Sequence, residues 1–144
     1  MFKNTLLTTP TLAIKTGSSA LAKHAAFQAL INGKLVVKGA ADLPAITSTI
    51  ADDFKKVYFF YMNAAGTVTI DASDAVALAA DIKINTLRNN ELALRDEGGV
   101  LLGWVVVINE SGSTFTGGTT ALDAANVTTY YHNAFGLTPQ DVAL

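Results

Sequence analysis

The chain has 144 residues, a formal net charge of −2 and no cysteine; 50% of its residues are hydrophobic and only 15% are charged. Soluble domains carry about 25% charged residues, so we expect something other than water to cover part of this surface. The length suits one domain, residues 1–144, in which folding buries about 70% of the unfolded chain's accessible surface. The lack of cysteine excludes disulfides, thiolate catalysis and zinc–thiolate sites.

Charge and hydropathy also bear on the partners. The ten basic residues are scattered between Lys3 and Arg95 without forming a basic stripe, so we expect no nucleic acid partner. The longest apolar run, residues 100–108, is far shorter than the about 20 residues of a membrane-spanning helix. The first ten residues are too polar for a secretory signal. We therefore expect neither a membrane partner nor export from the cytoplasm in which the chain is made.

The two ends of the chain read as extended segments. Residues 1–16 contain several threonines and Pro10, with one apolar stretch at residues 12–14, and they are interpreted as an extended arm that ends in a short strand. Residues 137–144 follow a turn-like Gly136 and are expected to form a flexible tail.

Asn32-Gly33 stands between two apolar stretches. This dipeptide favours a type I′ turn, in which both central residues have positive φ, and it predicts a hairpin of Phe27–Ile31 and Lys34–Lys38. Because the residues before the turn also favour helix, a helix over residues 19–30 is the alternative.

A second hairpin is expected from residues 57–62 and 67–71. The first segment is rich in aromatic residues, which favour strands, and the second alternates apolar and polar residues. Val68 and Ile70 should therefore pack, while Thr67, Thr69 and Asp71 face solvent. Residues 57–62 are apolar on both faces and need cover on both sides.

The middle of the chain contains the best helix candidate. Residues 73–83 begin with Ser73 as a suitable N-cap and Asp74 in the first turn, and they place four apolar residues on one side. Residues 88–97 are the most polar part of the chain and are assigned to an exposed loop.

The remaining segments complete a β-rich pattern. Residues 100–108 are apolar on both faces, as expected of a central strand, and residues 128–132 are the last strand. Between them lies a loop rich in glycine and threonine at residues 110–120. Six or seven short strands with one helix indicate an α+β, β-rich domain, built as a small antiparallel β-sandwich or barrel.

No catalytic, cofactor or metal site is predicted. His24 and His132 lie far apart in sequence and lack metal-ligand spacing, so they are interpreted as ordinary surface or partly buried residues. Asp71, Asp74 and Asp81 lack the glycine and glutamate of an EF-hand.

Three further features of the sequence lack the pattern of a functional site. Residues 117–120, Gly-Gly-Thr-Thr, lack the lysine of a phosphate-binding loop and are read as a flexible turn. Serines occur without a nucleophile elbow, which leaves hydrolase chemistry unsupported. The aromatic residues are assigned to the core and to interfaces rather than to stacking of bases or sugars. They are Tyr58, Phe59, Phe60, Tyr61, Tyr130 and Tyr131.

Three stretches carry a family resemblance. They are residues 27–34 (FQALINGK), residues 61–69 (YMNAAGTVT), and residues 103–107 (GWVVV) together with residues 115–123 (FTGGTTALD). In order and spacing the chain resembles small structural proteins of tailed bacteriophage virions.

The resemblance implies a non-enzymatic decoration or cement protein, without cofactors, that forms a homotrimer on the outer surface of the capsid and binds the major capsid protein. Low charge and apolar strands agree with this implication, because symmetry mates can cover the second face of residues 57–62 or 100–108. The arm suits a position across a capsid subunit. The alternatives are a tail, baseplate or head-fibre component whose loop 110–120 binds a host surface, and a small enzyme or sugar-binding module, which the few titratable residues disfavour.

Overall fold

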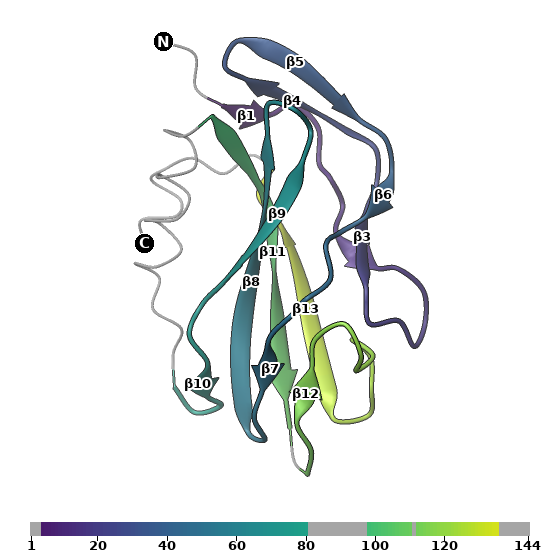
Figure 1. Ribbon diagram of the computed structural model, residues 1–144, viewed down its shortest axis with the longest axis vertical. Coiled ribbons are helices and arrows are strands. Elements are labelled where there is room, and N and C mark those ends of the chain that lie inside the picture. Colours follow the sequence, from purple (N-terminus) through teal and green to yellow (C-terminus); the bar gives the residue numbers. More distant parts are fainter. Residues whose placement is uncertain (1–3, 81–97, 111, 136–144) are drawn as a thin grey trace.

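The computed structural model describes residues 4–80, 98–110 and 112–135, and this part of the chain consists of strands and turns without a helix (Figure 1). The largest sheet is built around two long antiparallel neighbours, β8 (Phe54–Asn63) and β11 (Gly99–Asn109). On the far side of β11 lies β13 (Val127–Asn133), while β9 (Val68–Ala72) and β10 (Val76–Ala77) both pair with β8. The prediction of a β-rich antiparallel fold is thus confirmed.

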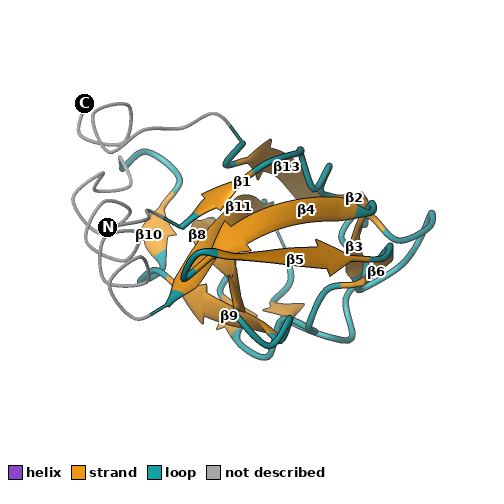
Figure 2. Ribbon diagram, turned by 90° about the horizontal axis from the view of Figure 1, so that it is seen from above, coloured by secondary structure: helices purple, strands orange, loops and turns teal. Residues whose placement is uncertain are grey.

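Three smaller antiparallel sheets accompany this central sheet. They are β1 (Thr5–Leu6), β4 (Phe27–Ile31) and β5 (Lys34–Lys38); β2 (Ala13–Ile14), β3 (Ala22–His24) and β6 (Ala41–Asp42); and β7 (Thr49–Ile50) with β12 (Phe115–Thr116). The β4–β5 hairpin lies over one end of the β8–β11 pair, as the view from above shows (Figure 2). Within the described residues no sheet closes on itself, so of the two architectures expected, sandwich or barrel, the barrel is wrong.

The β8–β11 pair forms the centre of the core. Every side chain from Val57 to Met62 is at most 3% exposed, and Leu102, Val105 and Val107 of β11 are fully buried. Both faces of residues 57–62 are therefore covered within a single chain. The expectation that symmetry mates cover this strand is wrong, because no face of it is left for them. On β11, the second face keeps partial exposure at Trp104, Val106 and Ile108.

The two predicted hairpins are confirmed. Asn32 and Gly33 have φ angles of 52° and 76°, as a type I′ turn requires, and the alternative helix over residues 19–30 is wrong. In the second hairpin, Val68 and Ile70 of β9 pack against the core while Thr69 is exposed. Residues 100–108 and 128–132 are also strands, within β11 and β13.

The helix predicted for residues 73–83 is absent from its described part, residues 73–80, and residues 81–83 lie outside the described part of the chain. Ser73 does not cap a helix. Its amide donates to the Val57 carbonyl at 2.9 Å, and its hydroxyl accepts from the Val57 amide at 3.0 Å. Beyond it, β10 pairs Val76 with Lys55. A helix of three turns is marginal on its own, and the segment pairs with β8 instead.

The N-terminal segment contributes residues to the core as well as to the surface. Leu6 and Leu12 are buried, at 7% and 5% exposure. The Asn4 amide Nδ2 donates to the Gly99 carbonyl at 2.9 Å, and its Oδ1 accepts from the Asn32 amide at 2.8 Å. Asn4 thus ties the β4–β5 turn to the start of β11. Residues 1–3, the loop at 88–97 and the tail at 137–144 lie outside the described residues.

A β-bulge in β11 depends on Gly103. Leu101 is opposite Tyr61 and Gly103 is opposite Phe60, so Leu102 is an extra residue in β11. A Cβ atom on Gly103 would lie 2.1 Å from the His132 carbonyl oxygen and 2.7 Å from Leu12 Cδ1. The backbones of β11 and β13 approach closely only because this position has no side chain.

We predict that Gly103→Ala lowers the free energy of unfolding by about 2 kcal/mol or more, because the added methyl group overpacks the site. Urea denaturation of the purified chain measures this change. Gly39→Ala is the matched control, since no atom lies within 4 Å of its Cβ position. Equal stability of the two variants would contradict the packing described for the bulge.

Candidate functional site

The outward side of the β1–β4–β5 sheet is an exposed and mostly apolar surface. Gln28 and Leu30 point outward from β4 and lie opposite Val37 and Leu35 of β5. The other outward residues are Thr5, opposite Leu30, and Leu7, whose amide donates to the Gln28 carbonyl. We call this surface the hairpin face; it consists of Thr5, Leu7, Gln28, Leu30, Leu35 and Val37. None of its six residues is charged.

The apolar side chains of the hairpin face are well exposed. Leu7, Leu35 and Val37 are 44%, 58% and 67% exposed. In addition, β5 is the edge strand of its sheet, so one row of its backbone groups faces away from β4. Natural proteins usually protect such edges, and contiguous apolar patches on a surface mark sites of interaction. The hairpin face is therefore the strongest candidate for a contact with another protein.

A second partly apolar surface lies on the central sheet, on β11 and β13. The rings of Trp104 and His132 stack with centroids 5.3 Å apart and planes 19° from parallel. Tyr130, opposite Val106, is 53% exposed. We call Trp104, Val106, Tyr130 and His132 the aromatic face. It lies on a different sheet from the hairpin face, so the chain presents two separate surfaces.

The structure does not bring the two histidines together. His24 is buried in β3, whereas His132 is exposed on β13. Among the described residues no three histidine, cysteine or acidic side chains converge as metal ligands would. Asp71 accepts a hydrogen bond from the Ala72 amide at 2.8 Å, Asp74 is exposed, and Asp81 lies outside the described residues.

The Gly-Gly-Thr-Thr segment is a closed turn. The amides of Thr119 and Thr120 donate to the Thr116 carbonyl at 3.1 Å and 2.8 Å, and the Gly117 amide donates to the Ser48 carbonyl at 2.9 Å. A Cβ atom on Gly117 would lie 2.4 Å from the Ile46 carbonyl oxygen. The glycine thus permits close packing, and these three amides are already used within the chain rather than offered to a phosphate.

The aromatic residues divide between core and surface. Tyr58, Phe59, Phe60 and Tyr61 are buried in the core, Tyr131 packs against it, and Tyr130 is exposed. Their assignment to packing is confirmed for the four buried residues. Tyr58 shares a hydrogen bond of 2.8 Å with the Ser48 hydroxyl.

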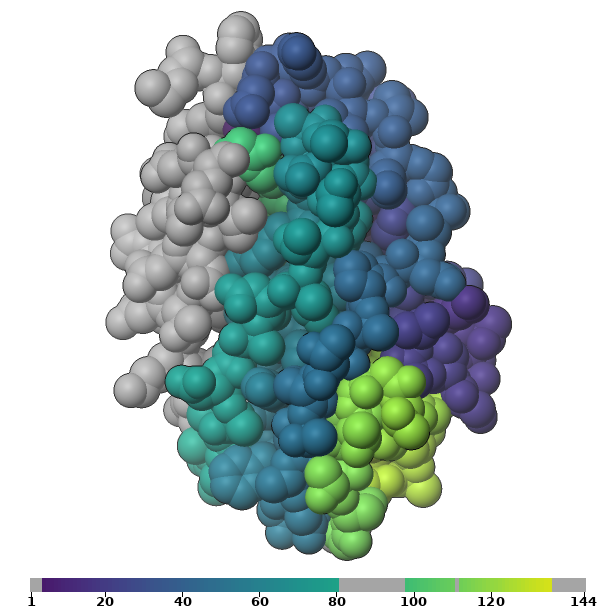
Figure 3. Space-filling model, in the orientation of Figure 1, coloured from purple at the N-terminus to yellow at the C-terminus, as the bar shows by residue number. Residues whose placement is uncertain are grey.

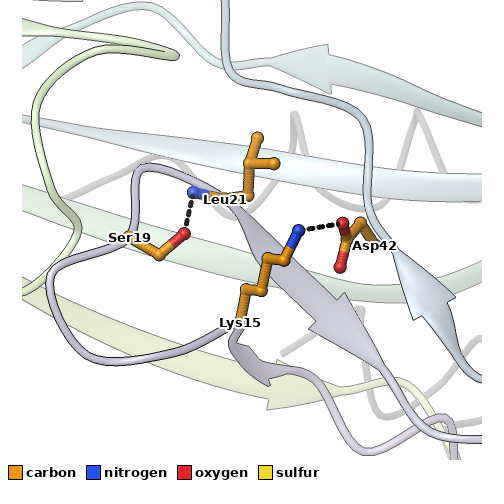
Figure 4. A network of polar contacts seen from close by, with 4 residues as sticks. All are labelled: Lys15, Ser19, Leu21 and Asp42. Atoms are coloured by element: carbon orange, nitrogen blue, oxygen red, sulfur yellow. Dashed lines mark hydrogen bonds and ion pairs between the residues drawn. The ribbon is translucent and has the colours of Figure 1, made fainter.

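Few charges interact in the described part of the chain. Lys15 Nζ lies 2.6 Å from Asp42 Oδ2 in a half-exposed ion pair that links the residue following β2 to β6 (Figure 4). Nearby, the Leu21 amide donates to Ser19 Oγ at 3.1 Å and shapes the turn before β3 (Figure 4).

Two tyrosines have raised pKa values. Burial, and to a smaller extent the Asp123 carboxylate, raises the pKa of Tyr131 to about 12. Burial also raises the pKa of Tyr58, against the opposing effect of its bond to Ser48.

Sequence reasoning missed the hairpin face, although it predicted the strands that form it. The available signal was residues 35–37, Leu-Val-Val, which place apolar side chains on both sides of a short strand. Only Val36 of these three packs against the core.

Comparison of the chain with models of protein families, with curated proteins and with solved structures finds no match. Within the described residues, no helix has both the length and the apolar character needed to cross a membrane.

We predict that the raised pKa of Tyr131 makes the chain less stable in alkali. The unfolded tyrosine ionises near pH 10 and the folded one near pH 12, so the free energy of unfolding falls between these values and is unaffected by this group below pH 10. Tyr131→Phe should reduce this alkaline loss, and Tyr130→Phe is the control at an exposed position. Denaturation at a series of pH values measures both; the same alkaline slope in Tyr131→Phe and the wild type would contradict the assignment.

Proposed function

We propose that the chain is a non-enzymatic structural protein of a phage virion, which decorates the outer surface of the head and stabilises it by binding major capsid subunits. The sequence resemblance to small virion proteins supports this proposal. Such a protein needs a surface for the shell rather than a catalytic pocket. It also needs a stable fold of its own, and a core that is covered within one chain suits that requirement.

The observation that carries the proposal is the hairpin face. The centre of a protein–protein interface is apolar and depleted in charge, and this face presents four leucine or valine side chains with no charged residue among its six. The free edge of β5 adds backbone donors and acceptors that an extended segment of a capsid subunit can pair with. We therefore assign the capsid contact to this face, to which Thr5 and Leu7 of the N-terminal segment contribute.

The aromatic face supports the further proposal of a homotrimer. A subunit that both binds the shell and contacts its own copies needs two surfaces, and Trp104 and Tyr130 lie on a different sheet from the hairpin face. Exposed tyrosine and tryptophan side chains are typical anchors of subunit interfaces.

A tail, baseplate or head-fibre component is the alternative, with host binding through residues 110–120. Phe115 in this segment is fully buried, and the Gly117 and Thr120 amides bond within the chain. These contacts favour a structural role for the segment over host binding. The number of copies per particle separates the two functions, because a decoration protein is present in hundreds of copies and a tail-tip protein in few.

We predict that the double variant Leu35→Thr/Val37→Thr binds heads at least about tenfold more weakly, since it removes two apolar contacts at the centre of the interface. Its free energy of unfolding should stay within about 0.5 kcal/mol of the wild type, because both side chains are exposed and threonine suits a strand. Cosedimentation with heads stripped of the protein measures binding. Thr69→Ala, on the exposed side of β9, is the control. Unchanged binding of the double variant would exclude the hairpin face as the contact.

We predict that the purified chain has a solution mass three times its 15.1 kDa, measured by light scattering at micromolar concentration. Tyr130→Thr should shift the mass toward that of one chain, because it removes an anchor from the aromatic face. A mass of 15.1 kDa for the wild type would rule out the trimer.

A further inference from the structure

The outer edge of β5 carries backbone groups that the described part of the chain does not use. Ile31 and Lys34 flank the two-residue turn and lie opposite each other, so they exchange the first hydrogen bonds between β4 and β5. Because bonded and non-bonded pairs alternate in antiparallel strands, the amides and carbonyls of Leu35 and Val37 point away from β4. Within the described residues none of these four groups has a hydrogen bond. The edge can therefore receive one further strand.

The side chains of the same two residues lie on the hairpin face. Leu35 and Val37 are 58% and 67% exposed. The space-filling view shows the blue segment that contains β5 at the surface, at the upper end of the molecule (Figure 3). A strand added at this edge places every second side chain on the hairpin face, beside Leu35 or Val37. The backbone and the side chains of such a strand thus meet the same two residues.

A lysine stands at each end of β5. Lys34 is exposed and Lys38 is partly exposed, and neither forms an ion pair within the part of the chain that the structure describes. Lys38 Nζ donates to the Gly66 carbonyl at 2.8 Å and keeps two further donors, since an ammonium has three. By the alternation of a strand, both lysine side chains leave on the opposite side of the sheet from the hairpin face. The edge therefore combines two apolar positions with two cationic ones.

These lysines disfavour a second copy of the chain as the added strand. Two β5 strands in an antiparallel pair centred on Val36 would place Lys34 of each copy opposite Lys38 of the other. Like charges directly opposite each other destabilise a sheet, and lysine on an edge strand commonly prevents such self-pairing. An acidic residue at either position of the added strand would form a favourable pair instead. The charges thus select a partner that is acidic where β5 is basic.

We propose that β5 binds an extended segment as an added antiparallel strand with the pattern acidic–apolar–any–apolar–acidic. The two apolar residues form backbone hydrogen bonds with Leu35 and Val37 and extend the hairpin face, while the acidic residues lie opposite Lys34 and Lys38. The antiparallel direction is that of all strand pairs among the described residues, and it is slightly the more stable one. The source of the segment, a capsid subunit, rests on the proposed function.

The test is a titration of the ¹⁵N-labelled full chain with the blocked peptide Ser-Glu-Val-Thr-Val-Glu-Ser, at up to millimolar concentrations, followed by NMR. We expect saturable shifts centred on the amides of Leu35 and Val37. A peptide with lysine in place of both glutamates should bind about tenfold more weakly or worse, because two opposite-charge pairs become like-charge pairs. The variant Lys34→Glu/Lys38→Glu should reverse this preference. Lys23→Glu, at an exposed position on β3, is the control and should keep it.

Methylation of peptide nitrogens tests the backbone pairing. Methyl groups on both valine nitrogens remove the donors that face the Leu35 and Val37 carbonyls, so they should abolish binding. A methyl group on the threonine nitrogen is the matched control. That nitrogen points away from β5, so the affinity should stay within about twofold of that of the unmodified peptide.

Several results would overturn the strand-binding site. They are no saturable shift with the glutamate peptide, equal binding of the glutamate and lysine peptides, and unchanged binding after methylation of both valines. Slow exchange of the Leu35 and Val37 amides in the free protein would also overturn it, because a second copy would then occupy the edge. If Lys34→Glu/Lys38→Glu fails to fold, the peptides and the wild type still decide.

Head binding separates this inference from the proposed function. If the peptides bind as described but the wild type does not bind heads, the proposed function fails and the strand-binding site stands. If Leu35→Thr/Val37→Thr loses head binding but the glutamate peptide does not bind the wild type, the capsid contact stands and the strand-binding site fails.

Discussion

The need to bury β8 and β11 on both faces governs the rest of this fold. Residues 57–62 expose at most 3% of any side chain, and they achieve this within a chain of 144 residues. Long apolar strands of this kind are stable only when other elements cover each face. Much of the remaining chain is accordingly divided into short strands that lie over this pair, and Leu6, Leu12 and Phe115 reach the core from three of the four sheets or their flanks.

The short strands that cover β8 and β11 have outer sides that remain exposed. A two- or five-residue strand on the surface of a core has one side that packs and one that does not, and the outer side of β5 carries Leu35 and Val37. Val36 packs inward while Leu35 and Val37 remain open. The low charge of the chain therefore has two causes. Part of it belongs to the doubly buried strands, and part to surfaces such as the hairpin face, where we propose that the capsid binds.

Local sequence patterns predicted the elements whose conformation depends mainly on their own residues. Asn32-Gly33 determined a turn, and alternation at residues 67–71 determined which side of β9 packs. The helix prediction at Ser73 was wrong because its hydroxyl bonds to the Val57 backbone, a partner 16 residues away that no local pattern indicates. Asn4, likewise, is fixed by Gly99 at a separation of 95 residues. Apolar residues on both faces of a strand indicate that cover exists, but not whether it comes from the same chain.

Hydrogen–deuterium exchange of the chain, free and bound to heads, tests the central claim most directly. That claim is that the core strands are covered by the chain itself and that the hairpin face meets the capsid. Amides of β8 and β11 should exchange slowly in the free protein and change little on binding, whereas those of β4 and β5 should gain protection. Gain of protection in β8 or β11 with none in β5 would contradict the account, because the core strands would then be the surface that the partner covers.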